Sequence, residues 1–371
     1  MIVHSDCRHY SGYKPCGKSE ECAECPDYAP WTRQILVIKL AAVGDVVRTT
    51  AILPGLKKRD ADCCLTWLTD PAAMPLLANN PLIDRLYPFT VEGLSAVQAA
   101  NYDLLLNFEK EPRALGFARN VAATVRKGFG ASASGTPIAA DADSEYALRL
   151  GLSDDLKFRH NTKTYMQIIY EMAGLPYEGQ EYVLEPSDAA LHFAVEFAKR
   201  HDLGTKMRVV GLNTGCGEVF ATKRWTVEGF IEMINELATI PRTRSLLLGG
   251  PLEVEFNRAI VERAGDRVLD TGCDNSLEQF LGLIECCDVV VSSDSLAMHL
   301  AIARRKQVVA LFGPTCHQEI ELFGRGEKIV SDFECSPCYR AECDIHPSCM
   351  EALRGATVAA AVRHCLERIE K

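Results

Sequence analysis

The stretch from residue 288 to residue 315 constrains the fold more strongly than any other part of the chain. It contains two short apolar runs, at 289–291 and 308–312, and neither run alternates with polar residues. Runs of this kind are typical of strands in a parallel sheet that is covered on both faces. A compact apolar segment, 296–302, separates them and suits a helix. We therefore expect a strand–helix–strand unit of an α/β fold.

A polar turn, Ser293-Asp294-Ser295, stands between the first of these strands and the helix. Its side chains can cap the helix N-terminus. In open α/β sheets ligands bind at the carboxyl ends of the strands, and a helix N-terminus suits a phosphate. His299, one turn into the helix, can face the same edge. From these residues alone, a nucleotide site and a helix cap beside a partly buried histidine are equally well supported.

The residues of this unit also resemble a known signature. The run SSDSLAMHLAIA followed by VVALFGPT is similar to the nucleotide-binding signature of the heptosyltransferases, glycosyltransferase family 9, which make the inner core of lipopolysaccharide. Asp294, Ser295 and His299 match, as does the run 312–315, whereas Leu296 stands where the family usually has glycine. The resemblance implies that these matching residues contact a nucleotide-sugar donor.

An N-terminal sheet is predicted from residue 34 onward. The first helix of this part of the chain is expected over 46–56, and Pro54 should kink or shorten it near its end. No G-x-G-x-x-G follows the first strand, which disfavours a dinucleotide-dependent oxidoreductase. Strands with helices between them, as in right-handed βα units, are expected at 35–38, 65–69, 85–89 and 104–108.

The turn after the first strand carries the candidate catalytic residue. The run KLAAVGDVVRTTAIL resembles the opening of the heptosyltransferase family, in which the aspartate of a Gly-Asp pair is the proposed general base, and Asp45 holds that position. An inverting transfer in one displacement needs a base for the acceptor hydroxyl proton, and a carboxylate can serve. The alternative, a first-turn aspartate favoured by the helix dipole, is compatible with this role. Lys39 is a weaker candidate for a contact on the acceptor side.

Residues 131–161 are rich in Ala, Ser and Asp and poorly patterned, so we expect a mobile loop with one short helix. Such a loop lies where the protein could contact a large acceptor. A helix over 164–173 and a linker over 174–187 follow. Ser187 or Asp188 then caps an amphipathic helix.

A second group of strands begins at 208–212, and a glycine-containing loop, 213–225, follows it. Such a loop can set backbone N–H groups against a diphosphate, and a neighbouring lysine adds a positive charge. The loop resembles the phosphate loop of the heptosyltransferases, which implies donor contacts from Thr214, Gly215 and Lys223.

The loop after the next strand, 245–248, holds a candidate for ribose recognition. Glu253 lies near where the family has a carboxylate that contacts the nucleoside ribose, and paired hydroxyls are natural partners for a carboxylate. Glu255 is the alternative if the alignment is displaced.

Eight of the sixteen cysteines fall in two sets near the chain ends. Clustered thiols in a reducing compartment bind metal more often than they form disulfides. We expect one structural metal site per set, holding zinc, iron or an iron–sulfur cluster, with unmetallated thiols as the alternative. His4, His9 and His346 are possible substitute ligands. The first set is Cys7, Cys16, Cys22 and Cys25, and the second is Cys335, Cys338, Cys343 and Cys349.

Composition limits the remaining classes of function. The net charge of −10 disfavours non-specific nucleic-acid binding, which draws on a basic surface. No apolar run reaches the roughly 18 residues needed to cross a bilayer. The first residues lack the basic and apolar regions of a signal peptide, so a cytoplasmic location is expected. Peripheral contact with a membrane stays open.

Together these features and the resemblance predict a GT-B fold: an α/β protein with two Rossmann-like domains whose parallel sheets face each other across a cleft, plus cysteine-rich terminal segments. The final helix, 358–369, is a candidate to pack back on the first domain. The expected parts are a cysteine-rich extension (1–33), an acceptor domain (34–180), a nucleotide-sugar domain (181–330) and a cysteine-rich segment with the final helix (331–371).

The resemblance implies an inverting glycosyltransferase that moves a sugar, most simply heptose, from an ADP-sugar to a hydroxyl of a lipopolysaccharide core, another glycan or a protein. No catalytic metal is expected if Lys223 and the helix after Asp294 stabilise the leaving diphosphate. Two alternatives remain. A nucleotide-sugar epimerase or hydrolase would turn over donor without acceptor, and a non-catalytic scaffold organised by its metal sites would tolerate loss of Asp45.

Overall fold

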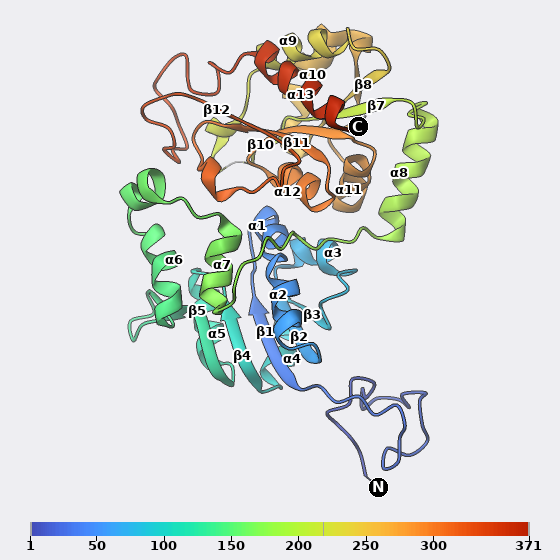
Figure 1. Ribbon diagram of the computed structural model, residues 1–371, viewed down its shortest axis with the longest axis vertical. Coiled ribbons are helices and arrows are strands. Elements are labelled where there is room, and N and C mark those ends of the chain that lie inside the picture. Colours follow the sequence, from blue (N-terminus) through green and yellow to red (C-terminus); the bar gives the residue numbers. More distant parts are fainter. Residues whose placement is uncertain (1, 218, 370–371) are drawn as a thin grey trace.

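Two mainly parallel sheets of six strands each form the cores of two domains, which are stacked in Figure 1. The structure, a computed structural model, describes residues 2–217 and 219–369. The first domain is coloured blue to green and the second yellow to red. The predicted fold class, two Rossmann-like domains whose sheets face each other across a cleft, is confirmed.

The first sheet has the strand order β3-β2-β1-β4-β5-β6, and only β6 runs antiparallel to its neighbour. β2 is buried along its whole length, as expected for a strand covered on both faces. The strands are β1 (Arg33–Ile38), β2 (Cys63–Thr69), β3 (Arg85–Pro88), β4 (Tyr102–Asn107), β5 (Ala123–Ala131) and β6 (Pro137–Ala139). The helices are α1 (Val43–Thr49), α2 (Ile52–Arg59), α3 (Met74–Leu77), α4 (Val91–Gln98), α5 (Pro112–Asn120), α6 (Glu145–Leu150) and α7 (Tyr165–Ala173).

The second sheet has the order β12-β11-β10-β7-β8-β9 and is parallel throughout. The predicted strand–helix–strand unit is its β10, α12 and β11. The strands are β7 (Arg208–Asn213), β8 (Thr243–Leu248), β9 (Val268–Asp270), β10 (Val289–Ser293), β11 (Gln307–Phe312) and β12 (Gly326–Val330). The helices are α8 (Asp188–Arg200), α9 (Val227–Leu237), α10 (Val254–Ala264), α11 (Leu277–Glu285), α12 (Leu296–Ala303) and α13 (Gly355–Ile369).

Each sheet reverses its strand order beside the first strand of its domain, between β1 and β4 in one and between β7 and β10 in the other. The connections leave these strand ends in opposite directions, which opens a crevice for a ligand. α1 follows β1 and α12 follows β10, and these two helices meet where the domains face each other (Figure 1). The two crevices therefore lie opposite each other.

The first predicted helix, 46–56, is two helices in the structure. α1 ends at Thr49 and α2 begins at Ile52. Pro54, which we expected to kink the helix near its end, instead lies in the first turn of α2. A first-turn proline costs little because the N–H that it lacks has no acceptor inside the helix. The proline therefore belongs to the start of a second helix.

Residues 131–161 contain more regular structure than predicted. β6 pairs antiparallel with β5 and adds a hairpin to the sheet. α6 and a single helical turn, Leu156–His160, follow, and α7 begins behind a capping box of Thr164 and Gln167. The sequence gives little signal for β6 because this short edge strand has exposed and half-buried side chains and no buried face.

The C-terminal helix α13 packs on the second domain, and the expectation that it packs on the first is wrong. Val358, Val362 and Cys365 on its buried face join the core that contains Phe230 of α9. At its start, Gly355 is so close to α9 that a β-carbon there would lie 2.5 Å from a carbonyl oxygen. The apolar face of α13 is therefore covered within its own domain.

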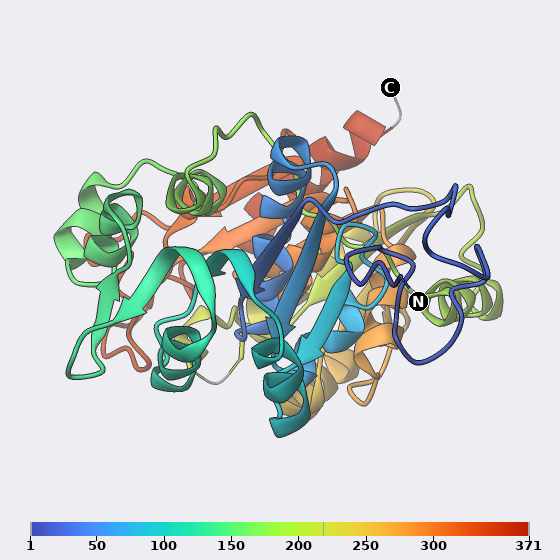
Figure 2. The same ribbon diagram turned by 90° about the horizontal axis from the view of Figure 1, so that it is seen from below.

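The two cysteine sets lie in separate places. The N-terminal extension is at the end of the first domain that points away from the second (Figures 1 and 2), where an ion pair of 2.6 Å joins Arg8 to Asp62. The second set lies in the loop that joins β12 to α13. Across residues 2–217 and 219–369, no helix has both the length and the apolar character to cross a membrane.

Candidate active site

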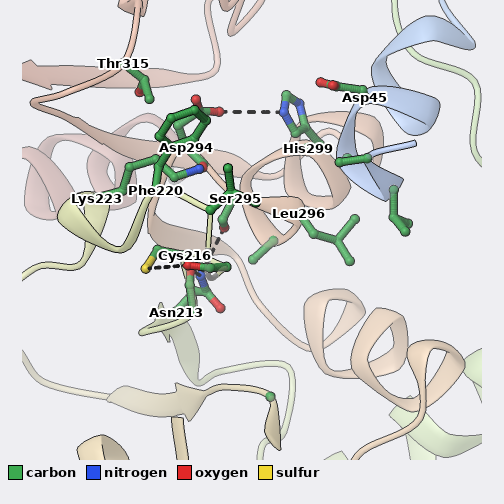
Figure 3. Close-up of a pocket in the computed structure, with 18 of the residues that line it drawn as sticks. Asp45, Asn213, Cys216, Phe220, Lys223, Asp294, Ser295, Leu296, His299 and Thr315 are labelled. Atoms are coloured by element: carbon green, nitrogen blue, oxygen red, sulfur yellow. Dashed lines mark hydrogen bonds and ion pairs between the residues drawn. The ribbon is translucent and has the colours of Figure 1, made fainter. Parts of the chain in front are cut away.

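A cavity of about 830 Å³ lies where the two domains meet. α1 supplies its wall from the first domain, and the segments after β7, β8, β10 and β11 supply most of the wall from the second (Figure 3). Its volume falls in the range of small-molecule sites. The predicted site residues that line it are Asp45, Gly215, Lys223, Glu253, Asp294, Ser295 and His299.

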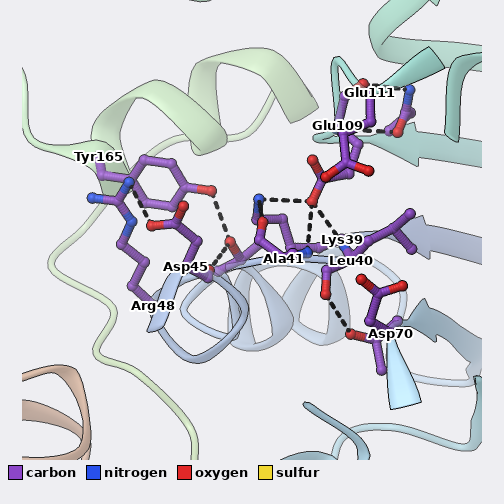
Figure 4. A network of polar contacts seen from close by, with 12 residues as sticks. Lys39, Leu40, Ala41, Asp45, Arg48, Asp70, Glu109, Glu111 and Tyr165 are labelled. Carbon is purple, nitrogen blue, oxygen red and sulfur yellow. Dashed lines mark hydrogen bonds and ion pairs between the residues drawn. The ribbon is translucent and has the colours of Figure 1, made fainter. Parts of the chain in front are cut away.

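Asp45 lies in the first turn of α1 and lines the cavity. Arg48, one turn further on, forms an ion pair with it, with Nη2 2.9 Å from Asp45 Oδ1. The guanidinium group of Arg48 lies over the ring of Tyr165, 3.8 Å from its centroid (Figure 4). These contacts hold the carboxylate in place while 36% of the Asp45 side chain stays exposed.

The charges around Asp45 favour its ionised form. Burial raises the pKa of Asp45, but the positive charges of Arg48 and Lys39 outweigh burial and hold that pKa below its ordinary value. An ionised carboxylate accepts protons and hydrogen bonds and donates none. The first domain therefore presents an ionised carboxylate to the cavity.

A buried ion pair fixes the turn between β1 and α1. Glu109 Oε1, at the end of β4, accepts hydrogen bonds from Lys39 Nζ at 2.8 Å and from the N–H groups of Leu40 and Ala41 at 2.8 and 3.1 Å (Figure 4). Lys39, the candidate for an acceptor contact, is 6% exposed and does not line the cavity. Its visible role is to hold the turn that leads to Asp45.

His299 lies on α12 of the second domain, next to Asp45 of the first (Figure 3). Its Nε2 is 3.8 Å from Asp294 Oδ1, and its Nδ1 is buried without a hydrogen-bond partner. Burial and the nearby charge of Arg48 lower the pKa of His299 to about 4. The ring is therefore neutral at neutral pH and acts as a polar, uncharged group.

Lys223 is held against the turn before α12. It ends a short helical turn, Ala221–Lys223, and its Nζ donates to the carbonyl oxygen of Asp294 at 2.7 Å. This contact places a positive charge beside the N-terminus of α12, where free N–H groups already favour an anion. The two features together make this wall suited to a diphosphate.

Asn213, at the end of β7, joins the phosphate-loop candidate to the same turn. Its Nδ2 donates to Gly215 O at 2.8 Å and to the hydroxyls of Ser292 and Ser295 at 3.1 Å each. Ser295 occupies the N-cap position of α12, yet its side chain makes no capping hydrogen bond. Its hydroxyl instead links the two loops, which corrects the predicted cap.

Glu253 lines the cavity from the segment after β8. It is 4% exposed, and its Oε2 accepts from the Gly250 N–H at 3.0 Å while Oε1 pairs with Arg224 at 3.2 Å. The alternative residue, Glu255, pairs with Arg258 and has a side chain that is 77% exposed. The structure therefore places Glu253, and not Glu255, at the site.

Thr214 is the one predicted donor-contact residue that does not line the cavity. Its hydroxyl donates to Asn257 Oδ1 at 2.6 Å, and its N–H donates to Leu248 O at 3.2 Å. Both groups are therefore occupied inside the domain. Trp225, at the end of the same loop, is buried, and its Nε1 donates to Leu353 O at 3.0 Å.

Sequence reasoning missed several polar residues that line the cavity, among them Arg48, Lys157, Glu319 and Tyr339. Arg48 could have been found from the sequence, because it stands three residues after Asp45 on one helix, a spacing that brings two side chains together. Lys157, Glu319 and Tyr339 come from irregular segments that are brought together only by the tertiary fold.

Each cysteine set lines a cavity of its own. The N-terminal four line a cavity of about 20 Å³ with His4 and His9, and the C-terminal four line one of about 670 Å³ with His346. All sixteen cysteines lie in the described ranges and are unpaired. Within those ranges no three His, Cys, Asp or Glu side chains form a group that could hold an ion. The donor chemistry of a metal site is present, but its closed geometry is not.

Comparisons with known proteins agree with these features. Residues 94–348 match the model of glycosyltransferase family 9 (heptosyltransferase). The chain is 22% identical over 311 residues to lipopolysaccharide heptosyltransferase 1 of Campylobacter coli, which covers 76% of this chain and 84% of that protein. It resembles the crystal structure of a family 9 glycosyltransferase from Veillonella parvula with a TM-score of 0.74 at 18% identity, over 91% and 98% of the two chains.

A third relative contains metal. The iron-containing, dodecameric heptosyltransferase TibC of enterotoxigenic E. coli, solved in complex with ADP-D-β-D-heptose, superposes with a TM-score of 0.56 at 12% identity. The match covers 91% of this chain and 77% of that one. At such identities the solved structures support the fold alone.

Proposed function

The chain belongs to glycosyltransferase family 9, the heptosyltransferases, and we propose that it transfers heptose from ADP-heptose to a hydroxyl of a lipopolysaccharide-core glycan. One observation carries the proposal: the base Asp45 and the cationic Lys223 line the same cavity from opposite domains. The two groups that a single-displacement glycosyl transfer requires, a base for the acceptor and a positive charge for the leaving group, are thereby set on either side of one space.

The donor is proposed to lie along the wall of the second domain. Glu253, buried at one end, accepts hydrogen bonds from the ribose hydroxyls. Lys223, the backbone N–H groups at Gly215 and the N-terminus of α12 bind the diphosphate. ADP-heptose is favoured because the solved complex of TibC contains it and that protein shares this fold.

The chemical step follows from this placement. Asp45 takes the proton of the acceptor hydroxyl as its oxygen forms a bond to the anomeric carbon. The bond between that carbon and the diphosphate oxygen breaks, and ADP leaves with the electron pair. Attack from the face opposite the diphosphate inverts the anomeric configuration. Lys223 stabilises the charge that develops on ADP, so we propose a transfer without a catalytic metal.

The first domain is proposed to receive the acceptor, because Asp45 faces the cavity from that side. We propose a cytoplasmic enzyme with peripheral contact with the membrane and no nucleic-acid partner, in line with its net charge of −10. A protein hydroxyl or another glycan is the alternative acceptor.

Both cysteine sets are proposed to hold a structural metal, zinc or iron. The support is that the four thiols of each set line one cavity, and that the relative TibC contains iron. Thiolate ligands bind either metal, and coordination would supply folding energy to two segments that are poor in secondary structure.

A transfer assay tests the proposal. Purified enzyme is incubated with ADP-heptose and a heptose-free lipopolysaccharide core, and ADP release and product mass are measured. We expect ADP to appear only when the acceptor is present and the acceptor to gain one heptose. ADP release without acceptor would instead indicate a hydrolase, and an epimerised donor would indicate an epimerase. Parallel reactions with UDP- and GDP-sugars test the choice of nucleotide.

A further inference from the structure

The loop that carries the second cysteine set reaches the active-site cavity through one side chain. This loop joins β12 to α13 (Figure 1), and Tyr339, the residue after Cys338, lines the cavity. None of the four thiols of the set lines that cavity. Tyr339 is therefore the direct physical link between the cysteine loop and the site of transfer.

Tyr339 is fixed firmly by its surroundings. The N–H groups of Cys338 and Tyr339 both donate to the carbonyl oxygen of Pro314, at 3.0 and 2.9 Å. The Tyr339 hydroxyl accepts from the Cys316 N–H at 3.2 Å. The backbone of Tyr339 has φ of 51°, a left-handed conformation that a bulky residue keeps only where its environment enforces it. Such a conformation at a cavity wall favours a functional reason for the side chain's position.

The ring of Tyr339 contacts both domains. From the first domain, Phe158 stacks on it with centroids 5.5 Å apart and planes 7° apart, and Lys157 Nζ lies 3.9 Å from its centroid. From the second domain, Phe220 meets it edge-on at 5.4 Å. Phe220 directly precedes the turn Ala221–Lys223. One aromatic ring thus bridges the first domain and the turn that carries Lys223.

A second contact ties the same turn to the same loop. The hydroxyl of Thr222 donates to the carbonyl oxygen of Arg340 at 2.6 Å. The loop also contacts the first domain next to Phe158, because Arg159 Nη2 donates to Glu334 O at 2.9 Å. Removing the ordered loop would therefore free the Lys223 turn on one side and the first domain on the other.

We propose that Tyr339 is a positioning residue, which holds the Lys223 turn against the donor diphosphate and couples the folded state of the cysteine loop to donor binding. The proposal rests on the proposed function, because it assigns Lys223 to the diphosphate. Aromatic contacts of this kind depend on ring area and geometry more than on the hydroxyl, so phenylalanine should replace tyrosine here with little loss.

The test compares Tyr339→Ala and Tyr339→Phe with a control on the same loop, Ile345→Ala. Ile345 is 46% exposed and does not line the active-site cavity. For Tyr339→Ala we expect ADP affinity, measured by calorimetry, to weaken about tenfold, the combined worth of two aromatic contacts. Hydrogen exchange of the amides at 219–223 should become faster without any ligand. Tyr339→Phe and Ile345→Ala should stay within about threefold of the parent affinity.

Unchanged exchange at 219–223 in Tyr339→Ala would overturn the proposal, as would an equal change in Ile345→Ala. If Tyr339→Ala does not fold, Thr222→Val removes the second contact and should accelerate exchange over the same residues, and no acceleration again overturns it. A parent protein that binds no ADP contradicts the proposed donor, while the exchange measurement still decides the role of Tyr339.

Discussion

Gly44 lies against the imidazole ring of His299, so closely that a β-carbon on residue 44 would stand 2.7 Å from His299 Cδ2. The same β-carbon would be 3.5 Å from Leu296 Cα. Helix α1, which carries the proposed base, and helix α12, the proposed diphosphate site, are therefore in contact across the cleft. Residue 44 can be only glycine if the two walls are to remain at this separation.

A change of Gly44 to alanine tests this contact. The His299 ring is 4% exposed and has little room to move, so we expect Gly44→Ala to cost about 1–3 kcal/mol of unfolding free energy, as overpacked sites do. The same displacement should lower kcat, because Asp45 is the next residue. Gly116→Ala in α5 is the matched control: a β-carbon there meets nothing within 4 Å, and it should stabilise by about 0.5–1 kcal/mol. Equal effects of the two changes would contradict a tight contact at Gly44.

His299 should make stability depend on pH. Its folded-state pKa of about 4 lies below the ordinary 6.5, so between these values the unfolded chain binds a proton that the folded protein does not. Stability is therefore fully present above pH 6.5 and is lost as the pH falls from 6.5 to 4, by up to about 3 kcal/mol. Denaturant unfolding at several pH values should show this slope, and His299→Gln should lack that part of it. An identical slope in the variant would show that other titratable groups cause this pH dependence of stability.

Lys223 should matter for donor affinity. Removing its ammonium group removes charge-assisted hydrogen bonds to the diphosphate, so Lys223→Ala should weaken ADP binding by about 1.5–3 kcal/mol, or about 10- to 150-fold. Lys58→Ala is the control, since Lys58 forms only an exposed pair with Glu178, with 67% of its own side chain exposed. Calorimetry that finds the two variants alike would remove Lys223 from the diphosphate site.

The cysteine sets should carry metal in protein purified without chelator. Elemental analysis should find zinc or iron, and Cys338→Ser should lower both metal content and the melting temperature, because loss of a ligand forfeits metal-linked folding energy. Cys22→Ser should remove the metal of the other set only. Cys63→Ser, in the buried strand β2, should leave metal content unchanged. Absence of both metals, with all eight thiols of the two sets alkylated in the native protein, would contradict the metal proposal.

Local patterns were sufficient for the parts of the site that lie beside regular elements. The apolar runs before and after α12 predicted β10 and β11. The position of Asp45 at the start of the helix that follows β1 predicted its place at the cleft. Tyr339 could not be predicted in this way, because it lies in an irregular loop and contacts rings from two distant segments.

Thr214 is the reverse case: a sequence pattern indicated a donor contact, but the residue does not line the cavity. The phosphate-loop pattern marked it for the donor, but Asn257 of α10, far along the chain, takes its hydroxyl. The placement of α13 was likewise decided by packing against α9, which no local pattern reports. Sequence patterns therefore located the elements and their ends, and long-range contacts decided which side chains face the cavity.

The last prediction concerns Asp45. Asparagine keeps the shape of the side chain and still accepts from Arg48, but it cannot take a proton. Asp45→Asn should therefore leave ADP affinity nearly unchanged while kcat falls by about 10²–10⁴, the usual contribution of acid–base catalysis. The ion pair with Arg48 is lost, yet Asp45 is 36% exposed, so the cost in stability should be only about 1 kcal/mol.

The pH dependence of kcat separates this role from a structural one. Arg48 and Lys39 hold the pKa of Asp45 below its ordinary 3.8 despite burial, so the carboxylate stays ionised well into the acid range. The parent enzyme should therefore lose no activity through Asp45 between pH 8 and about pH 5, roughly one unit above the ordinary value. An acid limb near pH 6 that Asp45→Asn abolishes would mean that the pKa is raised instead. Near-normal turnover of Asp45→Asn in the acceptor assay would leave Asp45 as a first-turn residue of α1. The base would then have to be sought among the other carboxylates that line the cavity, of which Glu319 is one.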